Sequence, residues 1–331
     1  MADTEEFARL ADPFRHELLV HCYRMLGSVD DAEDAVQETY LRAWRSYEGF
    51  EGRSSLRQWL YRIATNACLR AFEQGSRRPL PSGLGGPSED TEAPLATAGS
   101  EVRWLQPIPG TLLGTEPADP AAVVVSRGSV RLAFVAALQH LPPRQRAALI
   151  LRDVLAWRAG EVAEMLGTTT AAVNSALQRA RAQLAQVAPV EDETVEPAEP
   201  DRRALLDRYV AAFETADSTV LEQLLREDVE LEMPPFATWF AGRQAVGRFF
   251  SSRVLGGPGD LRMVPTNANG QPTAAGYLRG HDGVYRAHAV HVLSVTPTGI
   301  GRIVVFLDKE LFAIFGLPLS YSGRPVAGGR S

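Results

Sequence analysis

The sequence has few cysteines and no long hydrophobic run. Its 331 residues include only Cys22 and Cys68, which form neither a disulfide framework nor a zinc-site pattern. There is no stretch of 18 apolar residues, which excludes a helix long enough to cross a membrane. The first six residues are acidic and lack the apolar core of a signal peptide. These absences predict a soluble, cytoplasmic protein.

Metal-ligand spacing and nucleotide-binding loops are also absent from the sequence, so we expect no metal and no cofactor. The chain is 45% hydrophobic and 22% charged, which is enough apolar material to bury real cores. At roughly 100–200 residues per domain, its length predicts two or three domains.

The net charge of −6 is unevenly distributed along the chain. Residues 126–190 carry eight basic side chains against three acidic ones, a local charge of +5. Residues 42–78 carry eight arginines against three glutamates. Two basic segments within an acidic chain favour a polyanionic partner held at two places. The alternative is two solvated, arginine-rich faces with no partner.

Residues 14–75 show helical periodicity almost throughout. The clearest helix is predicted to begin at Asp30, with Glu33 positioned for a capping box. Its predicted buried face follows the i, i+3, i+4, i+7 spacing and comprises Ala32, Ala35, Val36, Thr39, Tyr40, Ala43 and Trp44. The pattern breaks at 49–55 and resumes from Leu56 to Phe72.

Two segments have the composition of linkers. Residues 76–125 contain eight prolines and six glycines, which is typical of a flexible connection. Within this segment, the apolar residues of 102–108 predict docking onto another domain or a partner, and the sequence does not decide which. Residues 189–200 are acidic and rich in proline, which indicates a domain boundary. The predicted parts are therefore 1–75, 76–125, 126–188, 189–200 and 201–331.

Residues 159–186 carry the spacing of a helix-turn-helix. Ala163 is small where two helices pack closely, and Gly167 suits a left-handed turn. Val173, Leu177 and Ala180 mark the inward face of the second helix. Short polar residues on the opposite face suit a helix in the DNA major groove, with nearby arginines placed for phosphates. These residues are Thr170, Ala171, Asn174, Ser175, Gln178, Arg179 and Arg181. An ordinary helical hairpin is the alternative.

Beyond residue 201 the pattern changes to that of an α+β domain with an antiparallel sheet. Two helices at about 202–226 precede period-two strands, among them 285–295 and 300–307.

Three blocks of sequence resemble the extracytoplasmic-function sigma factors of bacterial RNA polymerase. Residues 31–44 (DAEDAVQETYLRAW) are similar to the second conserved region of these factors, and residues 54–66 (SSLRQWLYRIATN) to its promoter-melting part. Residues 141–146 and 161–167 resemble the fourth region, which carries the helix-turn-helix. The resemblance implies two all-α sigma domains and a sigma-factor function in promoter recognition, melting and initiation.

The resemblance also implies site residues and partners. One face of the first helix would bind the clamp helices of the largest subunit of core RNA polymerase, through Asp34, Gln37, Glu38, Leu41 and Arg42. The loop at 50–56 and the following helix would bind the −10 element of promoter DNA by stacking and phosphate contacts, through Phe50, Arg53, Arg57, Trp59, Tyr61, Arg62 and Asn66. Trp59 also fits a core position. The helix-turn-helix would read the −35 element. Arg70 stands where the family often has Asp, so the family's −10 preference does not transfer in detail.

The last third resembles the SnoaL-like domains of the nuclear transport factor 2-like class, which are cone-shaped α+β barrels. The resemblance rests on the layout and on residues 239–247 (WFAGRQAVG). The domain is expected to modulate the sigma factor and to hold a small-molecule ligand. The candidate pocket residues are Phe236, Trp239, Tyr277, His288 and Phe306. The candidate acid–base groups are His281, His288, His291 and Asp308. A lone strand histidine is more often structural, so we expect no catalysis.

Two alternatives remain open at this point. The chain could be a helix-turn-helix repressor or activator with a ligand-sensing domain, or a sigma factor fused to a small cyclase-like enzyme. The first alternative leaves the 14–75 block without a purpose.

Overall fold

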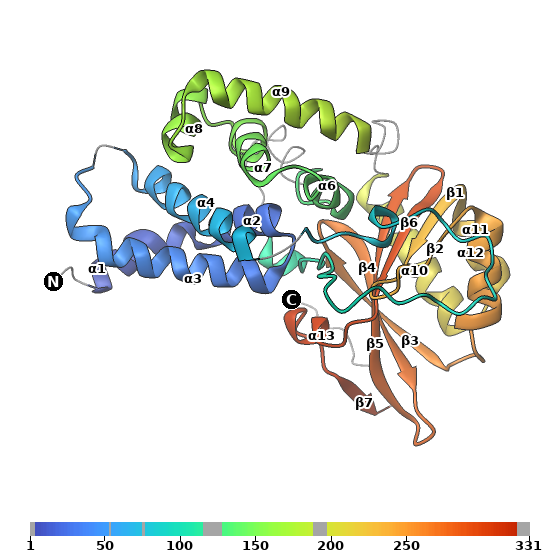
Figure 1. Ribbon diagram of the computed structural model, residues 1–331. Helices are drawn as coiled ribbons and strands as arrows, with labels where there is room; N and C mark the ends of the chain where they lie inside the picture. The colour runs from blue at the N-terminus through green and yellow to red at the C-terminus, as the bar shows by residue number, and fades with distance from the viewer. Residues whose placement is uncertain (1–3, 53, 75–76, 115–127, 188–196, 323–331) are drawn as a thin grey trace. The chain divides into compact units, whose positions relative to one another are not determined.

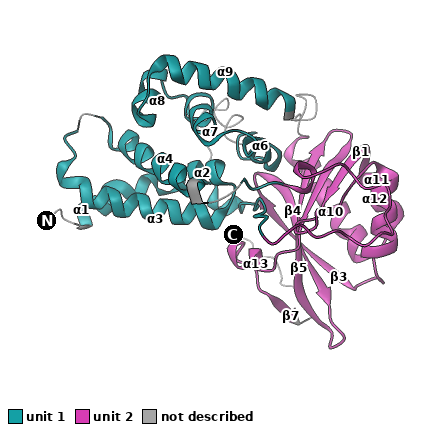
Figure 2. Ribbon diagram, in the orientation of Figure 1, with its two compact units in different colours: residues 1–79, 101–189 teal, residues 80–100, 190–331 magenta. Residues whose placement is uncertain are grey.

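The computed structural model describes residues 4–52, 54–74, 77–114, 128–187 and 197–322. The chain forms two compact units, and each contains segments distant in sequence (Figure 2). Unit 1 comprises residues 1–79 and 101–189, and unit 2 comprises residues 80–100 and 190–331. The linker predicted at 76–125 therefore contributes to both units.

The first half of unit 1 is a helical bundle (Figure 1). Its helices are α1 (Thr4–Ala11), α2 (Arg15–Leu26), α3 (Val29–Ser46) and α4 (Leu56–Gln74), with the short turns η1 (Asp12–Phe14) and η2 (Tyr47–Gly49) between them. Helix α3 begins one residue before the predicted Asp30, because Ser28 caps it by accepting a hydrogen bond from Asp31 N.

One residue predicted on the buried face of α3 is exposed. Ala32, Val36, Thr39 and Ala43 are buried as predicted, but Trp44 is 42% exposed. Trp44 therefore belongs to the exposed face of the helix. It follows Leu41, another exposed apolar residue (49%), by three positions, so the two are neighbours on that face. The periodicity alone misplaced Trp44 because its position lies at the edge of the apolar stripe.

The second half of unit 1 is also helical. It contains α6 (Leu132–Leu138), α7 (Pro143–Leu149), the π-helical turn η5 (Ile150–Val154), α8 (Ala159–Leu166) and α9 (Thr170–Val187). Helix α8 ends at Gly167, whose φ of 61° is left-handed, and Thr169 Oγ1 accepts a hydrogen bond from Ala172 N at the start of α9. The helix-turn-helix predicted from the spacing is therefore present.

The linker residues 101–113 dock onto the first helical bundle. Leu105 and Ile108 are fully buried, and the turn η4 (Gly110–Leu112) follows. Gln106 is clamped at the start of α3, since its Oε1 accepts hydrogen bonds from Ser28 Oγ at 2.7 Å and Val29 N at 3.0 Å. Gly27 permits this approach, because a Cβ there would lie 2.7 Å from Leu105 Cδ1. The predicted docking of 102–108 therefore has its partner in this domain.

Unit 2 is an α+β domain, as the sequence predicts. Its elements are α10 (Glu199–Glu214), α11 (Ser218–Leu224), β1 (Leu225–Glu232), β2 (Trp239–Ala241), α12 (Arg243–Phe249), η7 (Phe250–Val254), β3 (Leu261–Ala268), β4 (Gln271–Arg279), β5 (Val284–Thr296), β6 (Gly299–Phe306), α13 (Leu311–Ile314) and β7 (Ser320–Ser322), with the turn η3 (Pro81–Gly83) from the linker. The sheet order in the described residues is β2-β1-β6-β5-β4-β3, with β7 paired to β5. All pairs are antiparallel except β1 with β6.

The core of unit 2 lies between the helices and one face of the sheet. Tyr209 and Phe213 of α10 and Phe249 of α12 pack with Ala274, Leu293 and Ile303 of the strands. Helices therefore cover one face of an open, mostly antiparallel sheet, which is the layout expected for this α+β domain. Aromatic and aliphatic side chains fill its interior.

Candidate polymerase and promoter interfaces

The predicted −35 surface is presented on α9 as one open face. All seven predicted residues, from Thr170 to Arg181, are exposed. The intervening Val173, Leu177 and Ala180 are at most 4% exposed and hold the helix against α7 and α8. Arg181 pairs with Asp153 at 2.7 Å, so part of its charge is already compensated. The face offers amide and hydroxyl groups for base edges and arginines for phosphates.

The predicted polymerase surface is a continuous exposed face of α3. Asp34, Gln37, Leu41 and Arg42 are exposed, and Glu38 is half-buried and paired with Arg42. The exposed Trp44 adds a second large apolar side chain beside Leu41. Exposed apolar residues among charges are typical of a protein-binding surface rather than of a solvated helix.

The predicted −10 residues fall into an accessible set and a covered set. Arg62 is exposed, and Asn66, Phe50 and Trp59 are half-buried. Phe50 and Trp59 contact each other, with ring centroids 4.7 Å apart. Arg53 lies outside the described residues.

Tyr61 and Arg57 form the covered set. Tyr61 is fully buried, and the ring of Trp157, just before α8, lies 5.6 Å from its ring. Arg57 lies 4.9 Å from the Trp157 ring and 5.0 Å from the Tyr61 ring, and it also donates to Glu17 at 2.8 Å. Burial raises the pKa of Tyr61 above its usual value. In this structure the helix-turn-helix domain therefore covers part of the −10 candidate surface.

A buried arginine reinforces this contact between the two halves of unit 1. Arg146 of α7 is 2% exposed and lies 4.6 Å from the Phe72 ring of α4. Its guanidinium donates to Met25 O of α2 and to Gln139 Oε1, the latter at 2.8 Å. The sequence drew attention to the 141–146 motif only through its resemblance. The physical signal for Arg146 is tertiary, because burial of a charge becomes visible only in the fold.

The candidate pocket residues of unit 2 do not surround one cavity. Phe236 packs against the core and Trp239 donates from Nε1 to Gly85 O at 2.8 Å. Tyr277 contacts the rings of Phe312 and Tyr321, and His288 is the extra residue of a bulge in β5. Phe306 pairs with Val290, whereas the core-facing His291 pairs with Val305, so Phe306 lies on the other face of the sheet.

Among the candidate acid–base groups, the buried His291 is poorly suited to proton transfer near neutral pH. His291 is buried and bonded to Tyr209 Oη at 2.9 Å. Burial lowers the pKa of His291 to about 3 and raises the pKa of Tyr209 well above its usual value. His281 and Asp308 are exposed. Among the described residues, no cluster of His, Cys, Asp and Glu could hold a metal ion.

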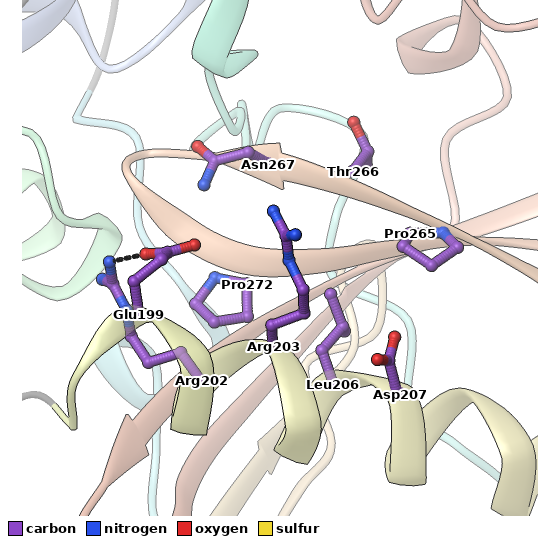
Figure 3. A pocket seen from close by; sticks show the side chains of 9 residues that line it. All are labelled: Glu199, Arg202, Arg203, Leu206, Asp207, Pro265, Thr266, Asn267 and Pro272. Carbon is purple, nitrogen blue, oxygen red and sulfur yellow. Dashed lines mark hydrogen bonds and ion pairs between the residues drawn. The ribbon is translucent and has the colours of Figure 1, made fainter. Parts of the chain in front are cut away.

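A surface cleft of about 460 Å³ lies between α10 and the β3–β4 hairpin (Figure 3). It contains none of the predicted pocket residues. Two arginines, Arg202 and Arg203, and two carboxylates, Glu199 and Asp207, face it, with Glu199 paired to Arg202. The remaining lining residues are Leu206, Pro265, Thr266, Asn267 and Pro272.

Comparison with known proteins identifies the class to which these domains belong. The profile of Sigma-70 region 2 matches residues 10–78, and that of Sigma-70 region 4 matches residues 131–184. These ranges contain the α3 and α4 surfaces and the helix-turn-helix respectively. The chain therefore carries the two conserved regions, 2 and 4, of a Sigma-70 factor.

Two curated relatives from Mycobacterium tuberculosis are similar over nearly the whole chain. The ECF RNA polymerase sigma factor SigG is 52% identical over 315 residues, covering 95% of this chain and 84% of its own. The ECF RNA polymerase sigma factor SigJ is 31% identical over 331 residues, covering 95% and 93%. The chain belongs to the extracytoplasmic-function sigma factors.

One solved structure shares the whole architecture. The crystal structure of SigJ from Mycobacterium tuberculosis superposes with a TM-score of 0.58, covering 96% of this chain and all of that one, at 24% identity. The likeness extends over the C-terminal α+β part as well as the helical part, and so shows the same overall fold.

Family membership decides between the alternatives that the sequence left open. As a sigma factor, the protein binds core RNA polymerase and promoter DNA and directs transcription initiation. It is not an enzyme, and the repressor interpretation is set aside. No helix in the described residues is both long and apolar enough to span a membrane.

Proposed function

We propose that three surfaces of this sigma factor carry its function: the exposed face of α3 for the polymerase clamp helices, the start of α4 for the −10 element, and the exposed face of α9 for the −35 element. The observation that carries the assignment is the complete exposure of the seven α9 residues beside a buried opposite face. A helix whose exposed face carries polar, small and arginine side chains suits a major groove.

The polymerase surface can be tested with a matched pair of variants. Leu41→Asp places a charge in the centre of the α3 face, whereas Leu278→Asp changes a leucine of similar exposure in unit 2. We expect Leu41→Asp to abolish co-elution with core RNA polymerase and Leu278→Asp to preserve it. Equal binding of both variants would contradict the assignment of α3.

We propose that the C-terminal domain modulates initiation without chemistry of its own. The inert environment of His291 supports this interpretation. The cleft beside α10 is the candidate site for a small-molecule ligand, because Arg203 offers a cation and Thr266 and Asn267 offer hydrogen-bonding groups around one opening.

The ligand site is tested by a thermal-shift screen of small carboxylates and phosphates against the full chain. Compounds that raise the melting temperature of the wild type but not of Arg203→Ala would support the cleft as the ligand site. Hits that are indifferent to this substitution would place the ligand elsewhere. Promoter-dependent transcription with core polymerase, with and without the hit, then measures its effect.

A further inference from the structure

Residues 80–100 lie in a loop of the chain whose flanking residues, Pro79 and Leu105, meet on the first sigma domain. Pro79 O accepts a hydrogen bond from Leu105 N at 3.2 Å, which closes the base of the loop. Arg78 strengthens the closure by donating to Trp104 O and Asp31 Oδ2, both at 3.1 Å. The chain therefore leaves the domain and returns to it within 25 residues.

The body of this loop belongs to unit 2 and is bound along its length by the C-terminal domain. At its start, Ser82 N donates to Glu232 Oε2 at 2.8 Å. In its middle, Trp239 Nε1 donates to Gly85 O, and Ser88 N donates to Trp239 O, both at 2.8 Å.

The end of the loop adds an extended strand contact. Ala96 N donates to Thr238 Oγ1 at 2.8 Å and Ala96 O accepts from Ala237 N at 2.7 Å. Thr97 and Phe236 form an antiparallel bridge. Arg253 donates to Ala93 O at 2.6 Å and to Thr91 O at 3.3 Å.

Apolar burial accompanies these polar contacts. Leu80 and Thr91 are at most 5% exposed, and Leu95 packs against the core of unit 2. Most polar contacts reach the backbone of the loop rather than its side chains. This is how a domain binds an extended peptide, with backbone hydrogen bonds for affinity and small pockets for register.

We propose that the C-terminal domain is a binding module for the linker loop 80–100, and that this capture restrains the sigma factor. The proposal rests on the modulating role given above and specifies its mechanism. Trp239, expected from the sequence to line a ligand pocket, is a loop-binding residue in this assignment.

The restraint follows from chain length. While the base is closed, the 25 residues from 80 to 104 add nothing to the connection between the two promoter-binding domains. Extended, they would supply about 80–90 Å. The −10 and −35 elements lie 25 base pairs apart by their names, or about 85 Å at 3.4 Å per pair. Release of the loop, followed by opening of its base, therefore frees a length of chain comparable to the separation that the two domains must span.

Capture is tested by hydrogen–deuterium exchange on the full chain. The wild type should protect the amides of Ser82, Ser88, Ala96 and Ala98. The double variant Trp239→Phe/Arg253→Ala removes side-chain donors to Gly85, Thr91 and Ala93. We expect protection in 80–100 to fall about tenfold and protection of the Leu105 amide, which closes the base of the loop, to fall with it. Arg248→Ala, an exposed arginine of α12, is the matched control.

Exchange in wild-type 80–100 at the rate of an unstructured peptide would overturn capture, as would a double variant that keeps full protection. Transcription from a promoter with core polymerase tests the restraint, and we expect the double variant to exceed the wild type by about two- to tenfold. Lost protection with unchanged transcription would overturn the restraint but leave capture standing. Failure of the wild type to initiate at all would instead contradict the promoter-binding assignments.

Discussion

The two helices proposed to read promoter DNA, α4 and α9, differ in what packs on their polar faces. Helix α9 presents its whole polar face, whereas α4 has Tyr61 and Arg57 beneath Trp157. Both helices follow from the same kind of periodic sequence, so the difference arises from what packs on them. If the proposed assignments hold, the −35 surface is accessible to duplex DNA in this arrangement, while the −10 surface needs a change in the contact between the two halves of unit 1.

The largest expected effect comes from removing the cover on α4. Trp157→Ala deletes a side chain that is 8% exposed, and large-to-small changes of this kind cost roughly 3–5 kcal/mol of unfolding free energy. We expect the variant to bind a single-stranded −10 oligonucleotide more tightly, because Tyr61 and Arg57 become accessible.

Fluorescence anisotropy measures this affinity, and denaturant unfolding measures the stability cost. Trp157→Phe serves as the control, since it retains an aromatic cover. Equal oligonucleotide binding by wild type and Trp157→Ala would show that the covered set plays no part in −10 binding.

The open helix should respond directly to loss of base contacts. Asn174→Ala or Gln178→Ala should each weaken binding to promoter duplex by about 1–3 kcal/mol, as expected for a lost contact to a base edge. Gln186→Ala, exposed near the end of α9 and outside the predicted set, should leave binding unchanged. An electrophoretic shift assay with holoenzyme at fixed salt makes the comparison. A uniform effect of all three changes would argue against specific reading by α9.

Acid should destabilise the helical bundle that contains the covered helix. His21 Nε2 of α2 is hydrogen-bonded to Thr65 Oγ1 of α4 at 2.9 Å. The centroid of its ring lies 5.1 Å from that of the Tyr61 ring. Burial lowers the pKa of His21 to about 3. Because the unfolded chain binds this proton near pH 6.5 and the folded chain does not, the stabilisation is present above pH 6.5 and is lost as the pH falls toward 3.

At pH 5 the expected loss is about 2 kcal/mol from this one group. The measurement is the free energy of unfolding as a function of pH. The slope of this dependence between pH 6.5 and pH 3 should be smaller in His21→Gln than in the wild type. His291 contributes a similar slope in unit 2, so exchange at the amides of α2 and α4 is needed to separate the two. An unchanged slope in His21→Gln would show that this histidine is protonated in the folded state.

The smallest effect concerns a surface ion pair on the open helix. Asp153→Ala frees Arg181, whose side chain is 60% exposed, and exposed pairs are worth about 0–1 kcal/mol. We expect slightly tighter, sequence-independent DNA binding at low salt, with no change in promoter preference. The DNA affinity is measured at several salt concentrations. If Arg181 contacts a phosphate, the logarithm of the binding constant should fall more steeply with the logarithm of the salt concentration in Asp153→Ala than in the wild type.

The sequence was most informative where local pattern and local structure coincide. The turn at Gly167, the polar face of α9 and the alternation of the strands were all predicted correctly, because each depends on neighbours within a few residues. Trp44 was misplaced, since the edge of an amphipathic stripe is decided by what packs there. The candidate pocket around Phe306 and His288 did not assemble, because face and register in a bulged strand depend on its partners.

The sequence by itself determined the class of protein, its two DNA-binding domains and the α+β character of its last third. Those properties are written in periodicity, turn residues and motif spacing. Only the tertiary structure decided that Trp157 covers Tyr61 and that Gln106 is clamped at the start of α3. It also decided that the proline-rich residues 80–100 are bound by the C-terminal domain. All of these contacts join positions more than 70 residues apart, so no local pattern could predict them. Those of the loop also reach its backbone atoms, which every sequence possesses.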